Sequence, residues 1–257
     1  MRFLVGHAVD PLFWIGLGSN LLIRDGGLRG TVISTGQLAR LDWTDTTHLY
    51  ADAGVSCARL ARAAATADRA GLAFMAGIPG TLGGALRMNA GALGGEIWQF
   101  VEWAEVISRA GRVERIPRAE FVASYRRVTQ PHPGWFVGAQ LALPDAARGE
   151  GNERIREVLA QRSATQPTGK ASCGSVFKNP PGDFAGRLIE QCGLKGHRIG
   201  GCEVSTVHGN FIVNDRAGNA ADIEQMIEFV RATVADRTGI ELETEVLIVG
   251  EAAQGNL

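Results

Sequence analysis

The most regular hydrophobic pattern in the chain lies between Asp222 and Asp236. Apolar residues recur there at three, four, seven and eleven positions from the first, which places them on one face of a helix. The residues of this stripe are Ile223, Met226, Ile227, Val230 and Val234. Asn219 stands three residues before Asp222 and could cap the helix, and Gly239 is placed to end it. We expect an ordinary helix that faces the core.

Three further helices and several short strands are predicted in the same way. The helices are expected at 56–70, with Ser56 as the N-cap, at about 153–163 and at 185–192. Short apolar runs between turn residues predict strands at 100–107, 112–116, 134–143, 210–214 and 241–249. This mixture of elements indicates an α+β fold.

A change of composition near residue 145 indicates a domain boundary. Pro144 and Asp145 close the block of strands, and charged, helix-forming sequence begins near Arg148. A chain of 257 residues can hold one large or two modest domains. We expect a first domain at 1–145 and a second at 146–244, with the strand at 245–250 as a candidate to return to the first.

The segment from Ala76 to Glu96 is unusually rich in glycine, with seven glycines among its 21 residues. Glycine costs roughly 0.5–1 kcal/mol relative to alanine inside a regular element, so we expect no packed helix or strand there. Bare backbone can instead bring main-chain N–H groups close to anionic groups of a ligand. Apolar residues between the glycines argue against a flexible linker. The segment is interpreted as a ligand cradle with little chemistry of its own.

A second phosphate-friendly loop lies upstream, in the sequence Gly16-Leu17-Gly18-Ser19-Asn20. An apolar run precedes it, which predicts a strand leading into a nest of main-chain N–H groups. The Rossmann fingerprint would need a further glycine at position 21, where the chain has leucine. A Walker loop would need Gly-Lys-Ser/Thr, which neither segment contains. The sequence therefore predicts a nucleotide site outside both of these common folds.

The segment 174–182, GSVFKNPPG, places a small hydroxyl beside a cation and an amide. It is not the Gly-x-Ser-x-Gly motif, because Cys173 and Phe177 occupy the two glycine positions. Ser175 is either a structural turn residue or part of a site. Lys178 and Asn179 beside it suit a phosphate or a carboxylate of a ligand.

Three other charged or titratable residues are candidates for the same chemistry. Strand alternation places Glu241, Glu243 and Glu245 on one face of the last strand, and Glu245 lies nearest its apolar end. Desolvation there could raise the pKa of Glu245, or the side chain could be a solvated edge glutamate. Arg126 could bind a carboxylate with both guanidinium nitrogens or could be solvated. His208 is either a pocket residue or an ordinary residue at a strand edge.

Composition narrows the range of functions. The formal net charge of −1 gives no reason to expect nucleic acid or an anionic membrane as a partner. No run approaches the ~18 apolar residues of a membrane span, and no basic region with an apolar stretch marks a secretory signal. The four cysteines lack Cys-x-x-Cys pairing, and the five histidines lack metal-ligand spacing. We expect a soluble cytoplasmic protein with free thiols and no metal site.

These segments together resemble the bacterial UDP-N-acetylenolpyruvoylglucosamine reductase family, also called UDP-N-acetylmuramate dehydrogenases. The similar stretches occur in the family's order and cover the chain from about residue 14 to 250. They are GLGSNLLIRDGGLRG, AGIPGTLGGALRMNAGALGGE, SYRR, TQP, CGSVFKNPPGDFAGRLIEQCGLKG, VHGNFIVN and ETEVLIVG. The two glycine segments and GSVFKNP are the most specific of them.

The resemblance implies a flavoprotein with a vanillyl-alcohol-oxidase-like FAD-binding domain and a smaller α/β substrate-binding domain. It implies that hydride passes from NADPH through FAD to the enolpyruvyl ether of a UDP-sugar. The product would be UDP-N-acetylmuramate, a precursor for peptidoglycan and so for cell-wall biogenesis, cell shape and cell division. The implied partners are these small molecules, with no nucleic acid and no membrane.

The resemblance also assigns residues. FAD contacts fall on the two glycine segments, at Gly16, Gly18, Ser19, Asn20, Gly77, Ile78, Pro79, Gly80, Gly83, Gly84, Asn89 and Gly91. Ser175 matches the serine that protonates the carbon next to the carboxylate after hydride delivery. Arg126 and Glu245 match the arginine and glutamate that stabilise the enolic intermediate. Lys178 and Asn179 match positions near the substrate.

Two departures from the family pattern leave alternatives open. The short span after Arg126 indicates the subtype without an extra substrate-covering segment. The family also carries a further segment before the loop at Gly16, which supplies the first βα units of the FAD domain. We expect that the start at Met1 lies too late. The alternatives are a non-catalytic relic that binds UDP-sugar or flavin, and a different oxidoreductase of the same flavin fold.

Overall fold

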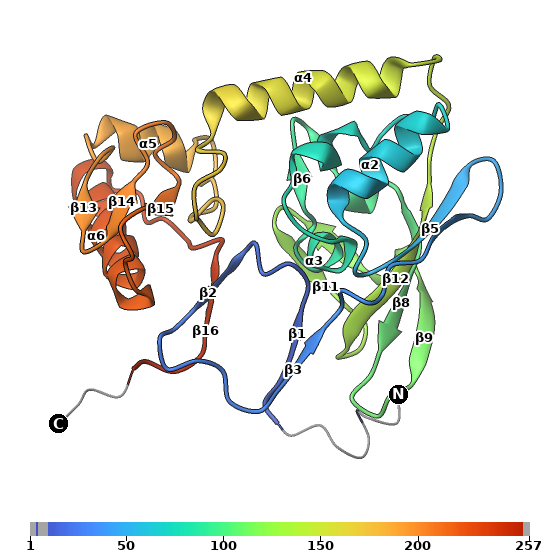
Figure 1. The fold of residues 1–257 in the computed structure, drawn as a ribbon, viewed down its shortest axis with the longest axis horizontal. Coiled ribbons are helices and arrows are strands. Elements are labelled where there is room, and N and C mark those ends of the chain that lie inside the picture. The colour runs from blue at the N-terminus through green and yellow to red at the C-terminus, as the bar shows by residue number, and fades with distance from the viewer. Residues whose placement is uncertain (1–3, 5–9, 254–257) are drawn as a thin grey trace. The chain divides into compact units, whose positions relative to one another are not determined.

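The computed structural model describes residue 4 and residues 10–253 (Figure 1). The chain forms two compact units. The first comprises Gly30–Gln161 and the chain up to Leu17, and the second comprises Gly18–Arg29 and the chain from Arg162 onward. Each unit has its own cluster of buried apolar side chains.

The first unit is built on a five-stranded antiparallel sheet in the order β4-β5-β12-β8-β9. Its strands are β4 (Leu41–Trp43), β5 (His48–Asp52), β8 (Val101–Ile107), β9 (Val113–Pro117) and β12 (Trp135–Ala142). The last three confirm the strands predicted at 100–107, 112–116 and 134–143. These three strands lie side by side in the sheet in the order β12-β8-β9, although a long connection separates β9 from β12 in the sequence.

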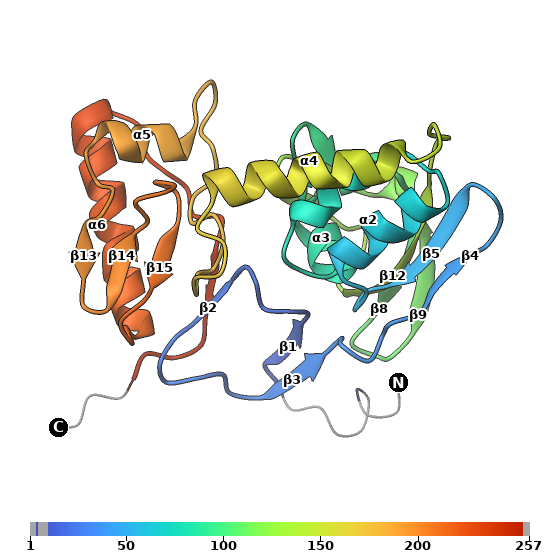
Figure 2. The same cartoon turned by 45° about the horizontal axis from the view of Figure 1, so that its top comes forward.

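Two helices pack on one face of this sheet (Figures 1 and 2). Helix α2 (Cys57–Thr66) begins at Ser56, whose hydroxyl accepts the backbone N–H of Arg59, so the predicted N-cap is confirmed. Helix α3 (Leu82–Met88) lies within the glycine-rich segment and follows the short 3-10 helix η1 (Ala73–Gly77). Their buried side chains join those of β5, β8 and β12 in one core.

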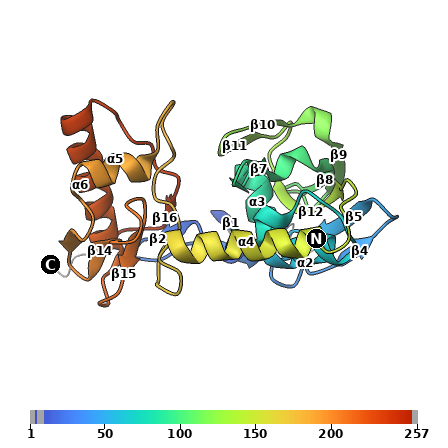
Figure 3. The same cartoon turned by 90° about the horizontal axis from the view of Figure 1, so that it is seen from above.

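Smaller elements complete the first unit. They are the parallel pair β1 (Leu12–Ile15) and β3 (Thr31–Ser34), the pair β6 (Gly91–Ala92) and β7 (Gly95–Glu96), the hairpin of β10 (Val122–Ser124) and β11 (Arg127–Thr129), and the 3-10 helices η2 (Ile97–Gln99) and η3 (Arg118–Glu120). The β10–β11 hairpin lies beside α3 (Figure 3).

Helix α4 (Glu150–Thr165) contains the border between the two units. The units divide between Gln161 and Arg162, near the end of this helix. The boundary expected near residue 145 therefore lies before α4, whereas the chain passes from the first unit to the second within this helix. A composition change marks the start of the helix, and nothing in composition marks the residue at which packing changes.

The second unit is a small antiparallel sheet with two helices. Its elements are β13 (Arg198–Ile199), β14 (Cys202–Val204) and β15 (Ile212–Asn214), with α5 (Ala185–Gln191) and α6 (Ala220–Thr238). Helix α6 buries four residues of the predicted stripe: Met226, Ile227, Val230 and Val234. Its N-terminus carries the predicted capping box of Asn219 and Asp222, and Gly239 ends it at φ +72°.

The C-terminal strand is shorter than the run 241–249. Regular pairing covers only β16 (Leu247–Val249), which runs parallel to β2 (Leu21–Ile23) in the second unit. Thr244 forms an isolated bridge with Phe177. Leu242 and Val246 are buried while Glu241 and Glu243 are exposed, so the predicted alternation holds across a segment that bends between two partners.

The capping box yields a stability prediction. The Asn219 side-chain oxygen accepts the N–H of Asp222 at 2.8 Å, and the Asp222 carboxylate accepts the N–H of Asn219 at 3.2 Å. Asn219→Ala removes the first bond and should lower the free energy of unfolding by about 0.5–2 kcal/mol, measured by urea denaturation. Asn219→Ser, which keeps a capping oxygen, should recover most of the loss. An alanine variant as stable as the parent would contradict the cap.

Candidate active site

The glycine-rich segment forms a helix, contrary to the expectation from its composition. Helix α3 begins after Thr81, and its Leu82 and Leu86 are fully buried. At position 83 the packing requires glycine, because a Cβ there would lie only 2.9 Å from the Cβ of Ala53. The helix therefore approaches the core more closely than a larger residue would allow. Gly84 differs, since a Cβ at that position meets nothing within 4 Å.

The two glycine segments meet at Thr81. A Cβ on Gly16 would overlap the Oγ1 atom of Thr81, so only glycine allows this approach. Thr81 is buried, and its Oγ1 has no hydrogen-bond partner among the residues that the structure describes. A buried hydroxyl without a partner is uncommon, and a bound group is one way to satisfy it. A bare α-carbon, an unpaired hydroxyl and the open side of Gly84 fit a ligand with anionic oxygens, the kind of ligand expected for the glycine-rich segment.

The second half of the upstream loop makes contacts within the protein, and its contact with FAD stays a prediction. Gly18 has φ +74°, a value that favours glycine, and its carbonyl accepts the N–H of Leu21 at 3.1 Å. The Asn20 side chain donates to the carbonyl of Glu245 at 3.0 Å, and the Asn20 carbonyl accepts the N–H of Leu247. Gly18, Ser19 and Asn20 lie in the second unit, where this part of the loop holds the C-terminal segment.

Asn89 is a predicted cofactor ligand whose side chain is used inside the protein. It is 1% exposed and ends α3 in the left-handed conformation, at φ +48°. Its amide nitrogen donates to the Glu96 carboxylate at 2.8 Å and to the carbonyl of Ser124 at 3.1 Å. Its amide oxygen accepts the N–H of Trp98 at 3.3 Å. These bonds tie α3 to the β10–β11 hairpin, and flavin contact by Asn89 stays a prediction.

Arg126 occupies the tip of that hairpin. Tyr125 and Arg126 form the two-residue turn between β10 and β11, and Arg126 has φ +53°. Its guanidinium donates to the carbonyl of Gly91 at 3.0 Å and lies 5.0 Å from the ring centre of Tyr125. A strained, glycine-like conformation in an arginine often marks a functional position. Arg126 belongs to the first unit, whereas Ser175 and Glu245 belong to the second.

Ser175 and Glu245 come together in the second unit. The segment after Ser175 lies against the C-terminal segment, where the carbonyl of Val176 accepts the N–H of Glu245 at 2.8 Å. The N–H of Lys178 donates to the carbonyl of Glu243, also at 2.8 Å. Ser175 and Glu245 are both half-buried. Main-chain hydrogen bonds therefore join two sequence motifs that are about seventy residues apart, and a shared catalytic site for Ser175 and Glu245 stays a prediction.

The predicted substrate-binding residues Lys178 and Asn179 are also placed by neighbours. The Lys178 ammonium forms an ion pair with the exposed carboxylate of Glu243. The Asn179 side chain accepts the N–H of Ala185 at 3.1 Å, at the start of α5. Lys178 and Asn179 follow Ser175 closely in the sequence, and these contacts hold them to Glu243 and to the start of α5.

Asn210 is the residue at this site that sequence reasoning missed. It is 4% exposed, and its amide bonds to both main-chain polar groups of Phe177. Its own carbonyl accepts the N–H of Val176 at 3.0 Å. In the sequence it is only the first residue of the apolar run 210–214, so no local signal distinguishes it.

Burial shifts the pKa of two titratable groups near this site, His208 and Cys173, in the direction that favours the neutral form. His208 accepts the N–H of Asn210 on Nδ1 at 3.1 Å. Burial lowers the pKa of His208 and Lys195 lowers it further, while Glu190 opposes the change. Burial raises the pKa of Cys173 to about 11, which makes this thiol a poor nucleophile. All four cysteines are free and buried.

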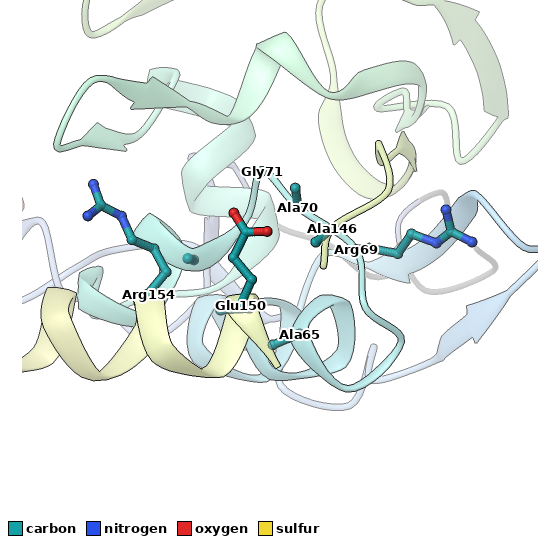
Figure 4. A pocket seen from close by; sticks show the side chains of 10 residues that line it. Ala65, Arg69, Ala70, Gly71, Ala146, Glu150 and Arg154 are labelled. Atoms are coloured by element: carbon teal, nitrogen blue, oxygen red, sulfur yellow. The ribbon is translucent and has the colours of Figure 1, made fainter. Parts of the chain in front are cut away.

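Neither a metal-binding cluster nor the cavity beside α2 and α4 marks a second functional site among the described residues. Within residue 4 and residues 10–253, no three His, Cys, Asp or Glu side chains are grouped to hold a metal ion. In the same part of the chain, no helix is both long and apolar enough to cross a membrane. A cavity between α2 and α4 holds about 60 Å³ and is lined by alanines with Arg69, Glu150 and Arg154 (Figure 4). It contains none of the predicted site residues and is too small for a nucleotide.

Comparison with known proteins identifies the family. A family model described as FAD binding domain matches residues 6–117, and one described as UDP-N-acetylenolpyruvoylglucosamine reductase, C-terminal domain, matches residues 166–249. UDP-N-acetylenolpyruvoylglucosamine reductase from Methylococcus capsulatus is 55% identical over 95% of this chain and 80% of its own length. The protein of that name from Alkalilimnicola ehrlichii is 52% identical over 95% of this chain and 82% of its own length. The chain belongs to the UDP-N-acetylenolpyruvoylglucosamine reductase family.

A solved structure supports the same assignment. The crystal structure of UDP-N-acetylenolpyruvylglucosamine reductase from Thermus caldophilus superposes with a TM-score of 0.83 at 34% identity. The match covers 95% of this chain and 86% of that one. The predicted fold class, a flavin-binding domain followed by the family's C-terminal domain, is confirmed.

The contrast between Gly83 and Gly84 gives a test of the cradle. Gly83→Ala should lower the melting temperature, because its Cβ would press on Ala53. Gly84→Ala should leave it unchanged or raise stability by roughly 0.5–1 kcal/mol, because a helical glycine is replaced where space is open. Gly84→Leu should fold equally well but bind less FAD, measured as the flavin-to-protein absorbance ratio. Full FAD occupancy in a folded Gly84→Leu would remove Gly84 from the cradle.

His208 gives a pH-dependent prediction. The pKa of His208 is lowered in the folded protein from its ordinary value of 6.5. As the pH falls below about 6.5, His208 therefore binds a proton more readily in the unfolded chain than in the folded protein. The free energy of unfolding should therefore decrease as the pH falls between about 7 and 5. Urea denaturation across this range would measure the slope. His208→Gln, which stays neutral and retains an acceptor, should show a smaller slope. An equal slope would mean that His208 does not charge on unfolding.

Proposed function

We propose that this protein is an FAD-dependent oxidoreductase that uses NADPH to reduce UDP-N-acetylglucosamine-enolpyruvate to UDP-N-acetylmuramate. Family membership over 95% of the chain supports the reaction. The observation that carries the proposal within the site is the hydrogen-bonded pairing of the Ser175 segment with Glu245. We place the reaction in peptidoglycan precursor synthesis in the cytoplasm, upstream of cell shape and cell division.

The residues around Thr81 would hold the cofactor. Gly16, Thr81 and Gly84 combine a close backbone approach, an unpaired buried hydroxyl and open space. When bound, FAD supplies hydride transfer, which no amino-acid side chain can provide. We propose that the other predicted FAD contacts on the two glycine segments also bind the cofactor. NADPH and the UDP-sugar are the proposed small-molecule partners.

The substrate's chemistry explains why a serine, an arginine and a glutamate are needed. Hydride addition to one carbon of the enolpyruvyl double bond moves an electron pair toward the carboxylate and creates an enolic intermediate. Arg126 is charged at every physiological pH and can stabilise the carboxylate oxygens. The Glu245 carboxyl group, when it carries a proton, can donate a hydrogen bond to the same oxygens. Both contacts strengthen as charge develops, so they favour the transition state over the substrate.

A proton must then reach the carbon next to the carboxylate. We propose that the Ser175 hydroxyl donates it while the electron pair of the enol returns to form the new C–H bond. The serine oxygen regains a proton from water, so the protein is unchanged after each turnover. The net change is addition of one hydride and one proton across the double bond. Lys178 and Asn179 are proposed to contact the substrate beside this group.

The two alternatives left open by the sequence are less well supported. The C-terminal domain match over residues 166–249 argues against an unrelated oxidoreductase on the same flavin fold. A non-catalytic relic would have no need to keep Ser175, Arg126 and Glu245 together in its sequence. The relatives that match across 80% or more of their length carry the reductase name.

The proton-donor role predicts an asymmetric effect of Ser175→Ala. Reduction of bound flavin by NADPH should stay close to the parent rate, because that half-reaction needs no proton from Ser175. Reoxidation by the enolpyruvyl UDP-sugar should slow by about 10²–10⁴-fold, the usual contribution of a positioned general acid. Stopped-flow absorbance of the flavin measures both half-reactions separately.

Ser175→Cys provides the matched control. A thiol can still deliver a proton, so this variant should recover part of the lost reoxidation rate. A purely structural serine would behave differently, with lower stability and similar losses in both half-reactions. Equal slowing of the two half-reactions by Ser175→Ala would rule out the donor role.

A further inference from the structure

We propose that Asn210 is a positioning residue that sets the main-chain geometry of Ser175 and Glu245. The inference rests on the proposed function, because it concerns the proton donor of that reaction. It arises from the three hydrogen bonds that this one residue makes to Val176 and Phe177.

The Asn210 amide replaces a missing strand partner. Its oxygen accepts the N–H of Phe177 at 2.9 Å, and its nitrogen donates to the carbonyl of the same residue at 2.8 Å. The backbone carbonyl of Asn210 also accepts the N–H of Val176 at 3.0 Å. A neighbouring strand would satisfy main-chain groups in the same way. The side chain is 4% exposed, so water cannot readily substitute for these bonds.

The Ser175 segment needs such a partner because it is not part of a regular strand. Among residue 4 and residues 10–253, its ladder contact is the isolated bridge between Phe177 and Thr244. Gly174 before it has φ +79°, and two prolines follow at 180 and 181, which cannot donate main-chain hydrogen bonds. Local sequence therefore does not fix its conformation. Long-range bonds to Asn210 and to residues 243–246 do.

We call the hydrogen bonds from Asn210 to Val176 and Phe177 the clamp. Through Val176, the clamp also reaches Glu245. The carbonyl of Val176 accepts the N–H groups of Glu245 at 2.8 Å and of Val246 at 3.3 Å. A shift of Val176 would therefore displace the donor Ser175 on one side and Glu245 on the other. Misplacement of reacting groups by about 1 Å can cost on the order of 10²-fold in rate. Asn210 contributes no chemistry itself, but its bonds set the distance between two groups that do.

The chain provides a matched control in Asn214, on β15. Its amide nitrogen donates to the carbonyl of Gly218 at 2.6 Å, and its oxygen accepts the N–H of Gly218 at 2.8 Å. Asn214→Ala thus removes the same pair of bonds from the same unit without touching the Ser175 segment. A general loss of stability in this unit would appear in both alanine variants.

The test compares Asn210→Ala, Asn210→Asp and Asn214→Ala in the FAD-loaded full chain. Asn210→Asp keeps the acceptor for the Phe177 N–H and loses the donor, and it carries the test if the alanine variant does not fold. Amide hydrogen exchange at Phe177 reports the clamp directly. Stopped-flow flavin absorbance reports the two half-reactions.

We expect exchange at Phe177 to rise at least about tenfold in Asn210→Ala, because its acceptor is lost. Reoxidation by the enolpyruvyl UDP-sugar should slow about 10- to 10²-fold, while reduction by NADPH stays near the parent rate. Asn210→Asp should fall between Asn210→Ala and the parent in both measurements. Asn214→Ala should raise exchange at Gly218 and leave both half-reactions near the parent rate.

Two results would overturn the proposal, and a third would overturn the function on which it rests. Faster exchange at Phe177 with unchanged reoxidation means that the clamp does not position the site. Equal slowing of both half-reactions, matched by Asn214→Ala, means that Asn210 serves only stability. Normal reoxidation in Ser175→Ala would instead refute the proposed proton donor, and the exchange data would still show whether the clamp exists.

Discussion

The site in the second unit depends on the hydrogen bonds of a short irregular segment, Ser175–Lys178. Val176 and Phe177 are buried, and buried main-chain N–H and C=O groups are costly to leave without partners. Because no regular strand flanks the segment on both sides, Asn210 supplies the partners on one side and residues 243–246 supply them on the other. The requirement to satisfy four main-chain groups thereby determines where the Ser175 hydroxyl and the Glu245 carboxylate are placed.

Glycine is used in two distinct ways in the first unit, and the structure separates them. Gly83 lets α3 approach Ala53, which solves a packing problem within the protein. Gly84 has open space beside it, which is what a ligand would require. The same composition therefore supports both a packed helix and a cradle. Composition alone could not distinguish them, and this is why a helix at Leu82–Met88 was unexpected.

Elements with local determinants were predictable from sequence, whereas long-range contacts were not. The stripe of α6, its capping box and the N-cap of α2 depend on residues within a few positions of one another, and all three are confirmed. The bonds of Asn89 and Asn210 join residues that are 7 to 35 positions apart, and nothing near either asparagine in the sequence indicates them. Motif resemblance named Ser175 and Glu245, but only the fold explains how Val176 links them.

The positioning contacts share a chemical property that favours constant geometry. Arg126 is held by the carbonyl of Gly91, and the Ser175 segment by the amide of Asn210, and neither partner titrates at any physiological pH. One titratable group enters this network, because the N–H of Asn210 donates to Nδ1 of His208. Protonation of Nδ1 would remove that acceptor. Burial lowers the pKa of His208 and so keeps the ring neutral, which preserves the bond that orients Asn210 and, through it, the proposed proton donor.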